Sequence, residues 1–318
     1  MPRCRCHITT TWLALLSLLG TLAACREKVS LLPKSGGRPF EVLVVGDRDS
    51  LLRKALSADV ECLPQPEPSF DVSATDSAHF AGALRLARSI VTVNIDPRLY
   101  PRLYTTTRIR YEKNVYAKPQ IMVYVGAPST RALARGLAAQ GPMLRQLLNR
   151  FEANATIAQL SHKRNIGAEK TIRKMFGVEM WVPMDMVSSK QGKDFLWLSN
   201  NSPTGMQNIV IYRSPVPQST DHYIHLRDSV MRLHIKGETD AMFMRTVKAT
   251  VVGSLTKEKG HSIMVHKGLW EMEGDDMGGP FIAHSRGGLT VEAFVFAPGM
   301  KKRNLLRRTE AALYTLKQ

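Results

Sequence analysis

The chain contains few cysteines: 4 among 318 residues, at Cys4, Cys6, Cys25 and Cys62. Three of them fall within the first 25 residues, so the rest of the chain holds a single thiol. One thiol cannot form an internal disulfide, and the fold must therefore depend on its apolar core. Cys62 precedes a proline-rich run and has no base beside it, which favours a buried structural residue over a nucleophile.

Long apolar segments are absent after residue 25. A membrane-spanning helix needs about 20 apolar residues, and the run Trp12–Leu22 near the N-terminus is shorter than that. Hydrophobic residues nevertheless make up 44% of the chain. That content is enough for one large packed domain or two smaller ones.

Acidic residues are also scarce, with 27 against 44 basic ones and a formal net charge of +17. This balance favours anionic partners: lipid headgroups, phosphorylated glycans or nucleic acid. The sequence has no P-loop, no nucleophile elbow and no cysteine-pair metal site. We therefore predict no catalytic residue, no metal and no cofactor.

The clearest signal that is present lies at the N-terminus. Two arginines give a positive start, the apolar run Trp12–Leu22 follows, and two alanines precede a cut, which is the order of a secretory signal. The segment Leu22-Ala23-Ala24-Cys25 resembles the bacterial lipobox, in which the cysteine accepts diacylglycerol and its new amine is acylated. A plain secretory signal that contains a cysteine by chance is the other interpretation. We predict a signal peptide over residues 1–24 and palmitate-type chains on Cys25, enough for stable anchoring.

Residues 25–38 are polar and form a predicted tether. No acidic run follows Cys25, unlike in surface-displayed lipoproteins of some Gram-negative groups. We therefore predict an outer-membrane lipoprotein of the cell envelope that faces the periplasm. Its expected partners are the membrane, through Cys25, and an anionic lipid or glycan. Export argues against nucleic acid, and the sequence names no protein partner.

Apolar runs and alternation predict strands, and capped periodic segments predict helices. The predicted strands are 40–45, 89–95, 109–116, 120–125, 178–182, 194–198, 208–212, 247–252, 263–272 and 289–296. The predicted helices are 50–56, 77–87, a long one from Ser129 that Gly141-Pro142 breaks, 168–175, 221–234 and 301–316. Many strands adjoin without a helix between them, which indicates an α+β fold with a mostly antiparallel sheet and packed helices.

A weak internal echo divides the globular region, residues 39–318. Residues 120–138 and 291–312 each read strand, Ala-Pro, helix. Two related α+β halves would explain this, with sub-domains at 39–165 and 166–318. Chance recurrence of a common unit is the slightly simpler explanation.

Several short stretches carry a family resemblance. They include Gly37–Val45, Leu63–Pro68, Gly268–Met272, Met277–Phe281 and Phe294–Gly299. Together they resemble the Bacteroidota lipoproteins grouped as domain of unknown function 4837, over essentially the whole mature chain. The resemblance implies an exported lipoprotein of about this size. It implies no activity and no catalytic residue, because the family has none assigned.

A glycine-rich stretch at 274–279 is surrounded by acidic residues: Glu273, Asp275 and Asp276, with His284 further on. Clustered carboxylates can bind a hard cation or act as acid and base, which makes this a candidate loop site. Its spacing is not that of an EF-hand loop. A tight turn that uses glycine for positive φ explains the same residues.

The start of the last predicted helix is basic, with Lys301, Lys302, Arg303, Arg307 and Arg308. Cations at that end oppose the helix dipole. An anionic partner such as lipid phosphate would relieve the repulsion, so these residues form a candidate anion-binding site. Carboxylates from elsewhere in the fold would relieve it equally well.

These observations favour a lipid-anchored, non-enzymatic binding or envelope-maintenance module. The alternative is a hydrolase that acts on envelope material through Glu273, Asp275, Asp276 and His284. A pocket that gathers those side chains would favour the enzyme, and a flat basic face would favour binding.

Overall fold

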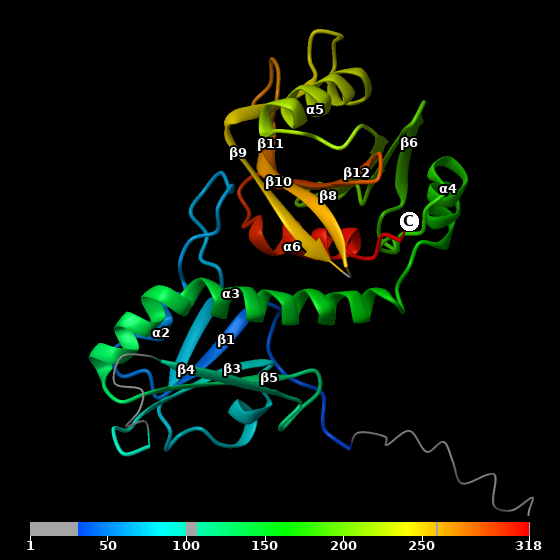
Figure 1. Cartoon of the computed structure of the whole chain (residues 1–318). Helices are drawn as coiled ribbons and strands as arrows, with labels where there is room; N and C mark the ends of the chain where they lie inside the picture. Colours follow the sequence, from blue (N-terminus) through cyan, green and yellow to red (C-terminus); the bar gives the residue numbers. More distant parts are fainter. Residues whose placement is uncertain (1–30, 100–106, 259, 318) are drawn as a thin grey trace, which may run out of the picture.

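The computed structural model describes residues 31–99, 107–258 and 260–317. Within these residues the strands form a five-stranded sheet in the first half and a seven-stranded sheet in the second (Figure 1). Helices pack on both sheets, which confirms the predicted α+β class. The predicted signal peptide and Cys25 lie outside the described residues. None of the described helices is long and apolar enough to cross a membrane.

The first sheet has the strand order β2-β1-β3-β5-β4. Its strands are β1 (Glu41–Val45), β2 (Asp71–Thr75), β3 (Ser89–Ile95), β4 (Arg108–Lys113) and β5 (Ile121–Ala127). Only the pair of β4 and β5 is antiparallel, and the other neighbours are parallel. Antiparallel pairing predominates only when the second sheet is included.

The two faces of the first sheet have different covers. The helices α2 (Leu51–Leu56) and α3 (Thr130–Leu160) pack on one face, over Val42, Val44 and Val123. The opposite face is covered by the chain around η2 (Gly82–Leu86), a short 3-10 turn. A helix was predicted over 77–87, but Gly82 has φ of 53°, which regular helical backbone does not allow.

The helix α3 connects the two halves. The predicted break at Gly141-Pro142 is wrong, because one helix continues through Pro142. After the proline, Leu144 and Leu148 pack in the first core, and Leu160 packs in the second. Burial on both sides of Pro142 offsets the hydrogen bond that the proline removes.

The second sheet is antiparallel throughout, with the order β6-β7-β8-β12-β11-β10-β9. Its strands are β6 (Ser188–Gly192), β7 (Phe195–Ser199), β8 (Met206–Arg213), β9 (Met244–Glu258), β10 (His261–Met272), β11 (Gly278–Arg286) and β12 (Leu289–Phe296). The helix α5 (Thr220–His234) covers one face. The other face carries α4 (Ile166–Phe176) and α6 (Arg303–Leu313), as Figure 1 shows.

One local prediction for the second half differs from the structure. Residues 178–182 form no strand, although Glu179 makes a single bridge to Lys317. The predicted echo is present as a local pattern, since β5 leads to α3 and β12 leads to α6. The two strands are paired differently, because β5 has a parallel neighbour and both neighbours of β12 are antiparallel.

Candidate functional site

The cations at the start of α6 meet the first half of the chain. The backbone N–H groups of Lys302 and Arg303 donate to the two carboxylate oxygens of Glu67, at 2.7 and 3.0 Å. The Arg303 guanidinium donates to the Pro68 carbonyl and, at 2.7 Å, to Asp71. A carboxylate at a helix N-terminus satisfies free N–H groups and opposes the positive end of the dipole. The negative charge that offsets the basic start of α6 thus comes from carboxylates of the same chain, Glu67 and Asp71.

The other cations of this set differ in exposure. Arg307 donates to the Ser69 carbonyl at 2.7 Å and lies over the Phe40 ring. Burial, helped by the neighbouring arginine at 303, lowers the pKa of Arg307 to about 10. Lys301 and Arg308 are exposed and lie 3.8 and 3.4 Å from the nearest oxygens of Asp71 and Asp185. Only these two cations present their side chains to solvent.

The structure does not assemble the candidate loop site. Asp275 and Asp276 are exposed in the turn between β10 and β11, and Glu273 pairs with Arg245 at 2.5 Å. His284 lies six residues beyond the start of β11, about 20 Å along the strand. Among the described residues, no three His, Cys, Asp or Glu side chains are grouped so as to hold a metal ion.

His284 is buried on the α6 side of the sheet. Its ring lies 4.9 Å from that of Tyr314, just after α6, and its Nε2 has no hydrogen-bond partner. Burial lowers the pKa of His284 to about 4. The side chain is therefore neutral near pH 7 and far from the acidic turn with which the sequence grouped it.

A buried charge network under α5 was missed by sequence reasoning. Arg227 donates from Nε and a terminal nitrogen to the two oxygens of Glu292 on β12, at 2.9 and 2.8 Å. The Tyr223 hydroxyl donates to the same carboxylate at 3.2 Å. The guanidinium also reaches the Thr246 hydroxyl at 2.9 Å and lies over the Phe281 ring.

This network is closed to solvent, since Arg227 and Glu292 both have 0% exposure. Burial is the largest influence on the pKa of Arg227 and lowers it, but Glu292 together with Tyr223 and Tyr212 outweighs burial, and the pKa is raised. Arg227 therefore keeps its charge, and its hydrogen bonds to Glu292 tie α5 to the sheet. A sequence signal existed: Arg227 takes the position between Tyr223 and Met231 in the apolar stripe of α5.

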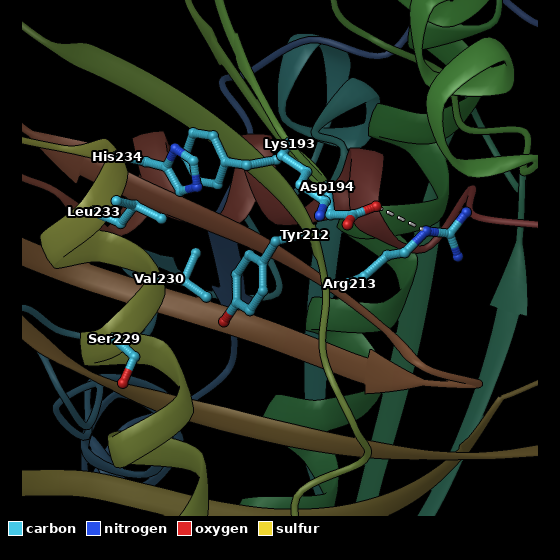
Figure 2. A pocket seen from close by; sticks show the side chains of 9 residues that line it. Lys193, Asp194, Tyr212, Arg213, Ser229, Val230, Leu233 and His234 are labelled. Atoms are coloured by element: carbon cyan, nitrogen blue, oxygen red, sulfur yellow. Dashed lines mark ion pairs between the residues drawn. The ribbon is translucent and has the colours of Figure 1, made fainter.

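A pocket of about 280 Å³ opens at the C-terminal end of α5 (Figure 2). It lies between that helix, the β6–β7 turn and β8. Figure 2 shows Val230 and Leu233 pointing from the helix toward the strands. The lining residues are Lys193, Asp194, Phe195, Tyr212, Arg213, Ser229, Val230, Leu233 and His234.

One wall of the pocket is a pair of stacked rings. The imidazole of His234 lies on Phe195, with centroids 4.1 Å apart and 5° between the planes. A Cβ on Gly192 would come 2.5 Å from this imidazole, so glycine makes room for it. Burial, helped by Lys190, lowers the pKa of His234. The wall is therefore flat and uncharged at neutral pH.

The rim of the pocket is charged. Arg213 lies 3.4 Å from Asp194, and its guanidinium also donates to the Phe176 carbonyl at 3.3 Å and lies over the Phe176 ring. Lys193 is exposed beside them. Leu233, with 67% exposure, adds an open apolar surface. The exposed ammonium of Lys193 and the apolar walls suit a small ligand with an apolar body and an acidic group.

Two family models match the chain. Residues 165–315 match the family described as "Domain of unknown function (DUF4837)", and residues 35–161 match "Domain of unknown function (DUF8532)". The resemblance predicted over essentially the whole mature chain is thus found in the second half, and the first half matches a different family. No curated protein matches the chain.

Among solved structures, a crystal structure from Bacteroides thetaiotaomicron VPI-5482 at 1.50 Å resolution is similar in part. The match covers 44% of this chain and 44% of that one, with 14% identity and a TM-score of 0.21. The chain thus corresponds to less than half of that protein's length. Each of the two family models that match covers less than half of the chain, and both are described as domains of unknown function.

Proposed function

We propose that this protein is an exported, lipid-anchored protein of the cell envelope that faces the periplasm from the outer membrane and acts as a binding module. The observation that carries the anchoring is the order of charged start, apolar run Trp12–Leu22 and small residues before Cys25. Two or more acyl chains on one cysteine hold a protein firmly at a bilayer.

Acyl labelling of the full chain in a bacterial host tests this proposal. The wild type should incorporate a labelled palmitate analogue and partition with membranes. Cys25→Ser should lose the label, and Cys62→Ser, which removes the other thiol of the mature chain, should keep it. A label that survives in Cys25→Ser would refute the lipid anchor.

The pocket beside His234 is the proposed binding site of the module, and its ligand is a small amphiphilic anion. Anilinonaphthalene sulfonate has that chemistry and reports binding by fluorescence. Lys193→Gln should weaken its affinity roughly tenfold through one lost charge-assisted contact. Lys301→Gln on the far side of the sheet is the control. Equal affinity in wild type and Lys193→Gln, with native circular dichroism in both, would remove the pocket from the proposal.

The hydrolase alternative loses the arrangement on which it depended. Asp275 and Asp276 are exposed in a turn, and His284 is buried on the face that α6 covers. No shared pocket brings these three side chains together within the described residues, so no observation favours that function.

A further inference from the structure

The described part of the tether is held against the first half of the chain. The Lys118 N–H donates to the Pro33 carbonyl at 2.9 Å, and the Gly36 N–H donates to the Leu86 carbonyl at 2.8 Å. Lys34 and Gly36 form bridges to Lys118 and Ala87. Residues 33–36 therefore lie between two segments that cover the sheet face away from α3, on the side where the described chain begins in Figure 1.

This docking limits the distance between the domain and its anchor. Cys25 and Pro33 are eight residues apart, and a fully extended chain of that length spans at most about 28 Å. By comparison, α3 has 31 residues and is about 46 Å long. A lipid on Cys25 thus keeps the surface around Pro33 near the bilayer, while it leaves the far half out of reach.

The surface around the docked tether is basic. Lys34, Arg85 and Lys118 are exposed, and no described carboxylate lies within ion-pair distance of them. The Arg85 guanidinium rests over the Tyr116 ring, 5.4 Å from its centroid. Leu84, with 38% exposure, adds an apolar side chain.

The nearby carboxylates are already engaged. Glu41 pairs with Arg38 at 2.7 Å, and Asp76 pairs with His79 at 2.8 Å. The three cations therefore keep their full attraction for an anionic surface. The α6 set differs, because Glu67 and Asp71 hold its buried members.

We propose that the surface formed by Lys34, Leu84, Arg85 and Lys118, the tether face, docks on anionic headgroups of the membrane that holds Cys25. This inference rests on the lipid anchor of the proposed function. Cations near an anionic leaflet each strengthen attraction, and three together amount to roughly a 100-fold preference over a neutral bilayer. The exposed leucine fits the boundary between headgroups and acyl chains.

The test uses the full lipidated protein with Cys62→Ser, reconstituted in vesicles of phosphatidylcholine with or without phosphatidylglycerol. A fluorophore is attached to Leu84→Cys or, as a matched position on α5, to Leu233→Cys. Brominated lipids quench the fluorophore when it lies against the bilayer. Quenching at position 84 should exceed that at position 233 several-fold in anionic vesicles. It should fall with added salt, because exposed charges are screened over about 10 Å at 0.1 M.

Charge reversal separates the tether face from general basicity. Lys34→Glu, Arg85→Glu and Lys118→Glu together should bring quenching at position 84 down to that at position 233, with the acyl label retained. The control reverses three other exposed cations, Lys248, Lys301 and Arg308, and should leave quenching unchanged.

Equal quenching at positions 84 and 233 would overturn the proposed docking of the tether face, and so would an equal loss of quenching in the control variant. In either case, an acyl label on Cys25 would still support the lipid anchor. Absence of acyl label on Cys25 overturns both.

Discussion

Each half of the molecule contains a buried arginine–glutamate pair that ties a helix to a sheet. In the first half, Glu152 on α3 accepts from Arg88, at the start of β3, at 3.0 and 2.9 Å. In the second half the roles are exchanged, since Arg227 is on α5 and Glu292 is on β12. Both carboxylates have 0% exposure. The pairs therefore differ in the donors around the carboxylate rather than in burial.

The donors decide how well each anion is compensated. Arg88 contacts both oxygens of Glu152 through a single nitrogen, Nε, and the Ser89 hydroxyl donates to the same carboxylate at 3.3 Å. Burial is then the largest influence, and it raises the pKa of Glu152 although Arg88 opposes it. Arg227 presents two nitrogens to Glu292, and Tyr223 adds a hydroxyl. A carboxylate with no exposed surface thus stays favourable as an anion only where enough hydrogen-bond donors replace the water that it has lost.

The largest expected effect comes from neutralising each carboxylate in turn. Glu292→Gln leaves the Arg227 charge buried without a partner, and breaking such a pair costs about 3–5 kcal/mol. Glu152→Gln removes a charge that burial already disfavours. Its loss in free energy of unfolding should therefore be about half that of Glu292→Gln, or smaller. The free energy of unfolding in urea measures both. Equal losses would mean that the number of donors does not distinguish the two pairs.

A second contrast between the halves is their response to pH. The folded-state pKa of His284, about 4, is below its ordinary value of 6.5. The neutral side chain of His284 therefore makes its full contribution to the free energy of unfolding above pH 6.5. That contribution is lost as the pH falls toward 4, a change of about 3 kcal/mol. Glu152 has the opposite sign, because its raised pKa makes folding less favourable as the pH rises from its ordinary value of 4.5.

Unfolding free energies measured between pH 4 and pH 7 check this contrast. His284→Phe should flatten the acid side of the profile, and Glu152→Gln should not. His266, whose pKa burial also lowers to about 4, should leave a residual slope in the histidine variant. An unchanged slope in His284→Phe would show that the imidazole does not remain neutral in the folded state.

Local signals in the sequence predicted much of the fold. The helix α5 begins after Ser219, whose side chain accepts from the His222 N–H, and α4 ends at Gly177 with φ of 73°. The strand β2 was missed because its side chains are partly buried or exposed, and because α2 separates it in the sequence from its partner β1. The strand β11 was missed because its first residues, Gly278-Gly279-Pro280, read as a turn. Gly279 is in fact needed for close packing, since a Cβ there would lie 2.0 Å from the Val295 carbonyl oxygen.

Long-range contacts were beyond sequence reasoning, even where their need was clear. The basic start of α6 required a carboxylate, and Glu67 in the segment Leu63–Pro68 supplies it from 235 residues away. Nothing local marks that residue as a helix cap. The pocket likewise joins the β6–β7 turn to α5, and no motif links those segments.

The smallest expected effect concerns the contact between the halves. The first residues of α6 have no side-chain cap of their own, so the Glu67 carboxylate serves as a remote one. Glu67→Gln keeps the shape of the side chain, but it loses one acceptor oxygen and the charge that complements the helix dipole. Loss of a cap and of a favourable dipole interaction each cost about 1 kcal/mol, so the expected loss is about 1–2 kcal/mol.

The matched control is Asp185→Asn, which removes the exposed carboxylate that faces Arg308 at 3.4 Å. Exposed pairs of this kind contribute little, so its unfolding curve should overlay that of the wild type. Amide hydrogen exchange of Lys302 and Arg303 gives a local readout, because their N–H groups donate to Glu67. Faster exchange there in Glu67→Gln, with α5 unaffected, would show that the carboxylate caps α6. Unchanged exchange would mean that the apolar contacts of α6 with the sheet hold its first turn without Glu67.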